Sequence, residues 1–134
     1  MMFARATILL ALISVAYSCT TSHITVTGTV SCDDHYQEFV LIELREHDTF
    51  TPDDSLNKTS SNNEGKFTIY GEDCEIGSIE PYLRITHKCD GGVINPHCTI
   101  TDDFPIPKDQ IGKTYKMGIV SLNIARGNRQ KHCD

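Results

Sequence analysis

Six cysteines behind an apolar amino-terminal segment constrain this chain more than any other feature of its sequence. Residues 1–18 combine one positive charge, Arg5, with an apolar stretch over residues 8–15 and small residues at Ala16 and Ser18. This arrangement is typical of a secretory signal peptide, and the apolar stretch is shorter than the about 20 residues that a membrane span needs. We therefore expect cleavage after Ser18 and a secreted protein without a transmembrane segment, in which residues 19–134 form one domain.

All six cysteines follow the expected cleavage site, at Cys19, Cys32, Cys74, Cys89, Cys98 and Cys133. An even number of cysteines behind a signal peptide predicts a disulfide framework, because the secretory compartment is oxidising. Spacing alone leaves several pairings open. Zinc binding is the alternative, but the sequence has no CxxC or HxxxH pair to favour it. A catalytic thiol is not expected, because an even number leaves no unpaired cysteine.

The charge balance narrows the classes of partner. The chain carries 18 Asp and Glu against 12 Lys and Arg, for a formal net charge of −6. Charge alone therefore argues against nucleic acid and against acidic membranes as partners. The carboxyl-terminal segment is the exception, because Arg126, Arg129, Lys131 and His132 lie close together there. A solvated tail and a contact surface both fit that pattern.

Alternation of apolar and polar residues with a period of two predicts β-strands along most of the chain. The pattern, or a short polar variant of it, occurs in residues 24–31, 39–45, 56–60, 66–70, 82–89, 98–101 and 115–125. In the last segment the apolar positions slip phase between Ile119 and Val120, which predicts a bulge or burial on both faces. We find no amphipathic helix. About seven short strands predict an all-β protein, a β-sandwich with a closed barrel as the alternative.

Acidic pairs recur in the expected turns, at Asp33-Asp34, Asp53-Asp54, Glu72-Asp73 and Asp102-Asp103. Carboxylate and carbonyl oxygens are the ligands of Ca²⁺, so two such loops meeting at one end of a sandwich would offer a calcium site. The spacing of an EF-hand is absent, and solvated turn residues explain the same pattern. We expect no resident metal and no cofactor, and we keep Asp33, Asp34, Asp102 and Asp103 as calcium candidates.

Two further residues carry specific expectations. Asn57 begins the sequon Asn57-Lys58-Thr59 in a polar run, so we expect glycosylation of Asn57 on a surface loop or an edge strand. His87 is in phase with Leu83 and Ile85, which favours a buried, hydrogen-bonded histidine over a general base. No GxSxG elbow supports nucleophilic catalysis, and we assign no catalytic residue.

Several blocks of the sequence together resemble the nematode transthyretin-like family, namely residues 28–32, 63–67, 79–89 with Cys98, 106–107, 117–125 and the final Cys133. The resemblance implies a transthyretin-like Greek-key sandwich of two sheets, and it implies secretion. It also implies the disulfides Cys89–Cys98, Cys32–Cys133 and Cys19–Cys74. The sequence departs from the family pattern at Asp33-Asp34-His35, and in Cys19 and Cys74, which are extra to the usual four cysteines.

For function, the resemblance implies no settled activity, because most members have none assigned. One member is similar to a bridging factor that binds phosphatidylserine on dying cells and a receptor on engulfing cells, and by analogy we expect an extracellular binding protein. We expect a monomer that recognises a membrane lipid headgroup or a receptor. The contact surface is expected at loops of one end of the sandwich, together with Arg126, Arg129 and Lys131. One alternative is a small-molecule carrier. The other is a 5-hydroxyisourate hydrolase, whose terminal Tyr-Arg-Gly-Ser motif is matched here only by Arg126-Gly127.

Overall fold

The computed structural model describes residues 19–75 and 79–134, which form eleven β-strands and one turn of 3-10 helix. The elements are β1 (Thr20–Cys32), β2 (His35–Tyr36), β3 (Leu41–Glu46), β4 (Asp54–Ser60), β5 (Lys66–Glu75), β6 (Pro81–His87), β7 (Cys89–Asp90), β8 (Val93–Ile94), β9 (Cys98–Pro105), η2 (Lys108–Gln110), β10 (Thr114–Ser121) and β11 (Gln130–Cys133). The expected signal peptide lies outside the described residues. Within them, no helix has the length and apolar character to cross a membrane.

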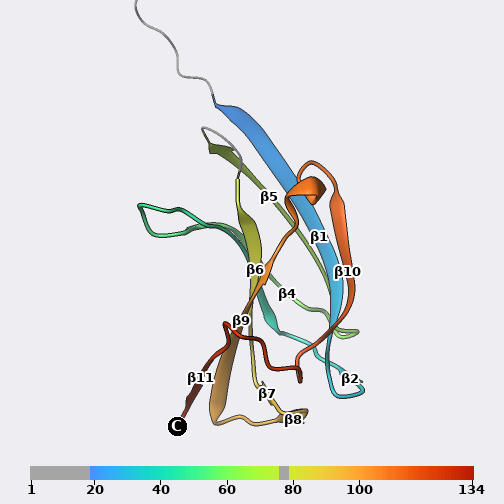
Figure 1. Cartoon of the computed structure of the whole chain (residues 1–134). Coiled ribbons are helices and arrows are strands. Elements are labelled where there is room, and N and C mark those ends of the chain that lie inside the picture. The colour runs from blue at the N-terminus through green and yellow to red at the C-terminus, as the bar shows by residue number, and fades with distance from the viewer. Residues whose placement is uncertain (1–18, 76–78) are drawn as a thin grey trace, which may run out of the picture.

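Two sheets form the sandwich (Figure 1). In the first sheet, β1 pairs with β10 in parallel and with β5 and β2 in antiparallel fashion. The second sheet is antiparallel throughout, in the order β11-β9-β6-β3-β4. A small hairpin of β7 and β8 follows β6. The all-β sandwich expected from the alternation is confirmed.

The apolar positions of the alternation fill the space between the sheets. The fully buried side chains include Ile24 and Val26 of β1, Ile42 and Leu44 of β3, and Ile85 of β6. Each such side chain stabilises the fold by about 1.5–3 kcal/mol relative to exposure. The expected phase slip is also present, because Tyr115 and Met117 pack against the core before it and Val120 and Leu122 are buried after it. Since Ile119 is 66% exposed, the slip is a bulge and not burial on both faces.

Two glycines have specific structural reasons. A Cβ on Gly28 would lie 2.8 Å from Cζ of Phe67, so only glycine lets this ring pack against β1. Between Thr27 and Thr29 of β1, the facing segment of β10 is one residue longer, which makes a bulge. Gly118 lies in this bulge and has φ +70. Glycine therefore permits both the close packing and the bulge.

Three disulfides link the strands, and two of them differ from the expected pairs. Cys19–Cys74 is present as expected, joining the start of β1 to β5. The pairs Cys89–Cys98 and Cys32–Cys133 were wrong, because the structure has Cys32–Cys89 and Cys98–Cys133 instead. The reason is the course of the carboxyl terminus, which forms β11 beside β9 rather than returning to β1. Cys133 is thus directly opposite Cys98, and the buried Cys89 is left to bond with Cys32.

Candidate functional site

Of the three cationic residues expected to contact a partner, Arg129 has a structural role, and Arg126 and Lys131 lie on the surface. Arg129 forms a bidentate pair with Asp102, at 2.8 Å from Nε and 2.7 Å from Nη2, and Nη2 also donates to the carbonyl of Leu122. Its guanidinium therefore holds the chain that leads into β11 and is not available to a partner. Arg126 lies 4.1 Å from the centre of the Phe104 ring, and Lys131 forms an ion pair of 2.8 Å with Asp90. Both of these residues remain exposed.

A buried histidine completes the Arg129 network. The Nε2 atom of His87 lies 2.9 Å from Oδ2 of Asp102, and Nδ1 accepts the backbone N–H of Cys89 at 3.0 Å. His87 is thus the neutral tautomer that carries its proton on Nε2 and donates it to Asp102. Burial lowers the pKa of His87 and outweighs the opposing hydrogen bond to Asp102. This is the hydrogen-bonded core histidine that the alternation predicts.

Asp102 is the shared acceptor of this network. Its burial alone would raise its pKa, but the hydrogen bonds from Arg129 and His87 outweigh that effect and lower the pKa. Asp102 is therefore a carboxylate with its acceptors in use. It faces inward and is 1% exposed, whereas Asp103 faces outward and forms a bidentate pair with Arg84.

The four calcium candidates do not form a site. Asp33 and Asp34 are exposed in the β1–β2 turn, where Asp33 has φ 55 and its N–H donates to Asn123. Asp102 and Asp103 point to opposite faces of β9, and each already pairs with an arginine. Neighbouring residues of a strand point to opposite faces, so the two acids cannot converge on one ion.

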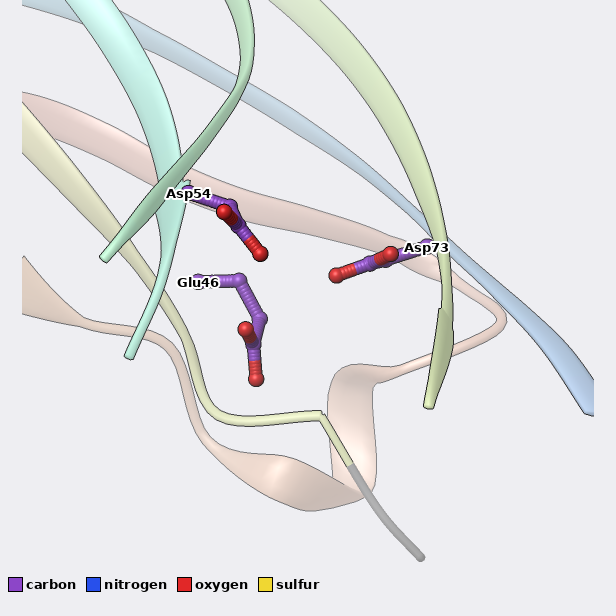
Figure 2. Close-up of side chains that lie close together, drawn as sticks. All are labelled: Glu46, Asp54 and Asp73. Atoms are coloured by element: carbon purple, nitrogen blue, oxygen red, sulfur yellow. The ribbon is translucent and has the colours of Figure 1, made fainter. Parts of the chain in front are cut away.

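A different set of carboxylates does come together. Oxygens of Glu46, Asp54 and Asp73 lie within 4.8 Å of one another, from the ends of β3, β4 and β5 (Figure 2). Glu46 is buried and accepts the backbone N–H of Glu80, while Asp54 is exposed. Repulsion by Asp48, with smaller effects of burial and of Asp73, raises the pKa of Asp54. These oxygens are of the type that Ca²⁺ and Mg²⁺ prefer. The acidic pairs of the sequence include Asp54 and Asp73, but their convergence with Glu46 was not predicted, because the three residues come from three strands.

The sequon lies on an edge strand, one of the two placements expected for it. Asn57 is exposed on β4, the last strand of the second sheet. Its Nδ2 atom, the acceptor of a glycan, donates to the carbonyl of Tyr70 on β5 at 2.7 Å. Glycosylation of Asn57 stays a prediction.

The elements β2, β8 and β11 lie at one end of the sandwich (Figure 1), and β2 and β8 carry exposed apolar side chains. Among the described residues nine large hydrophobic side chains are exposed, and five belong to β2, the start of β3 and its preceding connection, and β8. We call these five the apolar end, and they are Tyr36, Phe39, Leu41, Val93 and Ile94. Contiguous exposed apolar side chains are a common feature of interaction sites, which makes the apolar end the candidate site.

Phe39 is presented to solvent by a constrained backbone. It is 79% exposed and has φ 58, a conformation that costs free energy for a bulky residue. Ser61 holds it there: the Ser61 carbonyl accepts the N–H of Phe39, and Ser61 Oγ accepts the N–H of Val40 and donates to the carbonyl of Gln37. The backbone around Phe39 is thus held by hydrogen bonds to Ser61, a buried residue.

A hollow of about 250 Å³ lies within the apolar end. Its lining includes Phe39, Val40 and Ile94, together with Leu122 and His87. Sequence reasoning placed the contact surface at one end of the sandwich but did not identify these residues. Phe39 was expected to begin a strand, and the pairing of Phe39 and Val40 with Ile94 depends on tertiary structure.

The structure defines a class of protein: a small β-sandwich linked by disulfides, with an apolar surface site at one end. Residues 27–107 match the family model described as the transthyretin-like family. Three relatives from Caenorhabditis elegans are similar to the chain. Transthyretin-like protein 16 is 36% identical, covering 92% of this chain and 94% of the relative. Transthyretin-like protein 46 is 28% identical, with coverages of 86% and 68%, and transthyretin-like protein 2 is 31% identical, with 71% of each.

The chain belongs to the transthyretin-like family, as the residue blocks indicated. None of these three relatives has the name of an enzyme. Among solved structures, a 9R-lipoxygenase from Cyanothece is similar with a TM-score of 0.46 and 18% identity, over 74% of this chain and 16% of that chain.

Proposed function

We propose that the chain is a secreted binding protein that recognises a protein on a cell surface through the apolar end. The observation that carries this proposal is the hollow lined by Phe39 and Ile94, with exposed apolar side chains around it. Binding energy in protein interfaces is concentrated in a few apolar side chains that fill such pockets. A partner side chain seated in the hollow would contact Phe39, whose backbone is already held in place, so little ordering of the backbone is needed on binding.

A protein partner fits this end better than an anionic lipid headgroup. Asp33, Asp34 and Glu38 are exposed in or next to the elements that form the apolar end. The chain as a whole has a formal net charge of −6. Both features oppose binding to a negatively charged membrane. The hollow is concave, whereas insertion into lipid needs apolar side chains that protrude together.

Secretion is part of the same proposal. Three disulfides fit an oxidising compartment. Residues 1–18 have the composition of a signal peptide. Expression in a eukaryotic secretory cell line should release the protein into the medium, with Cys19 as its first residue on amino-terminal sequencing. Retention in the cell lysate with residues 1–18 intact would contradict secretion.

The binding proposal is tested with labelled, oxidised protein on cells dissociated from Caenorhabditis elegans, the source of the relatives. We expect saturable binding that is displaced by unlabelled protein and lost after mild protease treatment of the cells. Flotation with phosphatidylserine and phosphatidylcholine vesicles, each with and without calcium, is the parallel measurement, and we expect no binding there. Vesicle binding together with protease-resistant cell binding would replace the protein partner by a lipid. Absence of saturable binding to cells would count against the function itself.

A further inference from the structure

A second hollow, of about 370 Å³, lies on the outer face of the five-stranded sheet, away from the apolar end. Tyr82 and Arg84 reach it from β6, and Asp103 and Pro105 reach it from β9. These are the outward positions of both strands, because Leu83 between the first two is fully buried in the core. The volume is within the range of small-molecule sites.

The floor of this hollow is apolar and fixed in place. Tyr82 is only 8% exposed, and its hydroxyl donates to Asp53 at 2.5 Å while it accepts from Nε of Arg45 at 2.9 Å. Pro81 and Ile106 join Tyr82 and are also buried. The guanidinium of Arg84 lies over the Tyr82 ring, 5.9 Å from its centre, so the exposed part of the apolar lining is contributed mainly by Pro105.

Two of the three carboxylates at the rim, Asp53 and Asp103, are already in use, and the third, Glu80, forms a loose ion pair with Lys108. The carboxylate of Asp53 accepts from Tyr82, from the N–H of Asp48 and, when Nδ1 of His47 carries the proton, from that ring. The carboxylate of Asp103 accepts two hydrogen bonds from Arg84. Neither carboxylate is therefore well placed to bind a further cation.

The donors at the rim are not all in use. Arg84 binds Asp103 through Nε and Nη2, and Nη1 has no partner among the described residues. His47 contacts Asp53 through Nδ1, and no hydrogen bond of its Nε2 occurs among the described residues. Lys108 makes only a loose ion pair of 3.5 Å with Glu80, and both side chains are largely exposed. The hollow thus has spare N–H donors beside buried apolar residues, and its two cations, Arg84 and Lys108, are each paired with one acid.

We propose that this hollow binds a small organic carboxylate with an apolar body. The carboxylate group would lie against Arg84 and Lys108, where planar and charged donors suit it. The apolar body would pack mainly on Pro105, beside Tyr82 and Ile106. The site is separate from the apolar end, so it does not depend on the proposed recognition of a cell surface.

The test is a titration of the ¹⁵N-labelled, oxidised protein with 3-phenylpropionate, followed by NMR. We expect saturable shifts of amides in residues 81–84 and 103–108, with a dissociation constant at or below the millimolar range. The neutral 3-phenylpropionamide should bind at least fivefold more weakly, and so should acetate, which lacks the apolar body. Equal binding of the amide, or saturable shifts at other residues only, would overturn the proposal.

Two variants locate the contact. Arg84→Gln should weaken binding of 3-phenylpropionate at least fivefold, and Lys108→Gln at least twofold. Lys116→Gln on β10 is the matched control, because it removes one exposed lysine charge outside the hollow. Lys108 is exposed, so its variant keeps the test valid if Arg84→Gln does not fold. Unchanged affinity in every folded variant, or an equal loss in Lys116→Gln, would contradict the proposed site.

Discussion

His87 shows how one buried residue links three separate segments of the chain. Its ring joins β6 to Asp102 on β9 and to the backbone of Cys89 on β7, and Asp102 in turn holds Arg129 before β11. The apolar phase of β6 was enough to predict that His87 is buried. Its partners could not be predicted, because they lie on strands whose pairing the sequence does not reveal.

The pKa of His87 leads to a pH prediction. Burial lowers this pKa below the ordinary value of 6.5. Below about pH 6.5 the unfolded chain binds a proton at His87 that the folded chain excludes. The contribution of neutral His87 to the free energy of unfolding is therefore fully present above about pH 6.5 and is lost as the pH falls. We expect the free energy of unfolding, from urea titrations, to drop between pH 7 and pH 5 with a slope of up to about 1.4 kcal/mol per pH unit.

His87→Gln is the control for that pH dependence. The variant is less stable at pH 7, but it has no imidazole to titrate at this position. Its unfolding free energy should therefore vary less between pH 7 and pH 5 than that of the parent. The carboxylates with lowered pKa, Asp102 among them, titrate at lower pH and so contribute little in this window. An equal slope in both proteins would show that His87 is not the group responsible.

Asp102 and Asp103 allow a comparison of the same substitution on two faces of one strand. Asp102→Asn would leave the partly buried guanidinium of Arg129 without its carboxylate, which we expect to cost about 3 kcal/mol of unfolding free energy. Asp103→Asn breaks a more exposed pair with Arg84, and the cost should be at most about 1 kcal/mol. Thermal or urea unfolding measures both. Similar losses for the two variants would contradict the assignment of Asp102 as the structural acid.

Gly28 provides a test of packing at the residue scale. Gly28→Ala places a methyl group against the Phe67 ring, and such overpacking costs about 1–3 kcal/mol. Gly127→Ala is the matched control, because a Cβ at that position would have no atom within 4 Å and the φ of Gly127 is not positive. We expect a lower midpoint of urea unfolding for Gly28→Ala alone. A midpoint equal to that of the control would show that Phe67 moves away without cost.

At the scale of elements, the sequence predicted those strands whose alternation reflects burial on one face. The strand from residue 66 extends beyond its expected end at residue 70, because pairing with β1 continues to Glu75 through polar residues. The last predicted strand ends at Ser121 instead of residue 125. The strands β2, β7, β8 and β11 were not predicted, since two to four residues are too few to show a period.

The wrong disulfide pairs follow from the strand β11, which was not predicted. The pairs in the structure can be tested directly by peptide mapping. A digest of the oxidised protein that cuts before Asp90 separates Cys89 from Cys98. We expect mass spectrometry to find Cys89 joined to Cys32 and Cys98 joined to Cys133. Replacing both Cys98 and Cys133 by serine should lower the unfolding free energy by about 2–4 kcal/mol. A Cys89–Cys98 peptide would refute the observed topology of β11.

At the scale of the whole molecule, the sandwich has two candidate sites with different chemistry. The apolar end offers exposed side chains around a hollow, and the outer face of the second sheet offers donors above an apolar floor. Composition predicted neither site, since both depend on which strand ends and strand faces meet. What composition did predict is the disulfide-linked scaffold that holds them. The expected monomer stays a prediction.

The central claim is that the apolar end is the binding surface, and one comparison of variants tests it most directly. Phe39→Ser removes an exposed aromatic ring from the hollow, and Phe50→Ser removes one that is 96% exposed in the β3–β4 connection, which projects away from that end (Figure 1). The measurement is the equilibrium affinity of each labelled variant for intact cells. We predict at least a tenfold loss for Phe39→Ser, since truncation of a central interface residue costs about 2 kcal/mol or more, and parent affinity for Phe50→Ser. Equal affinity of the two variants would contradict the claim.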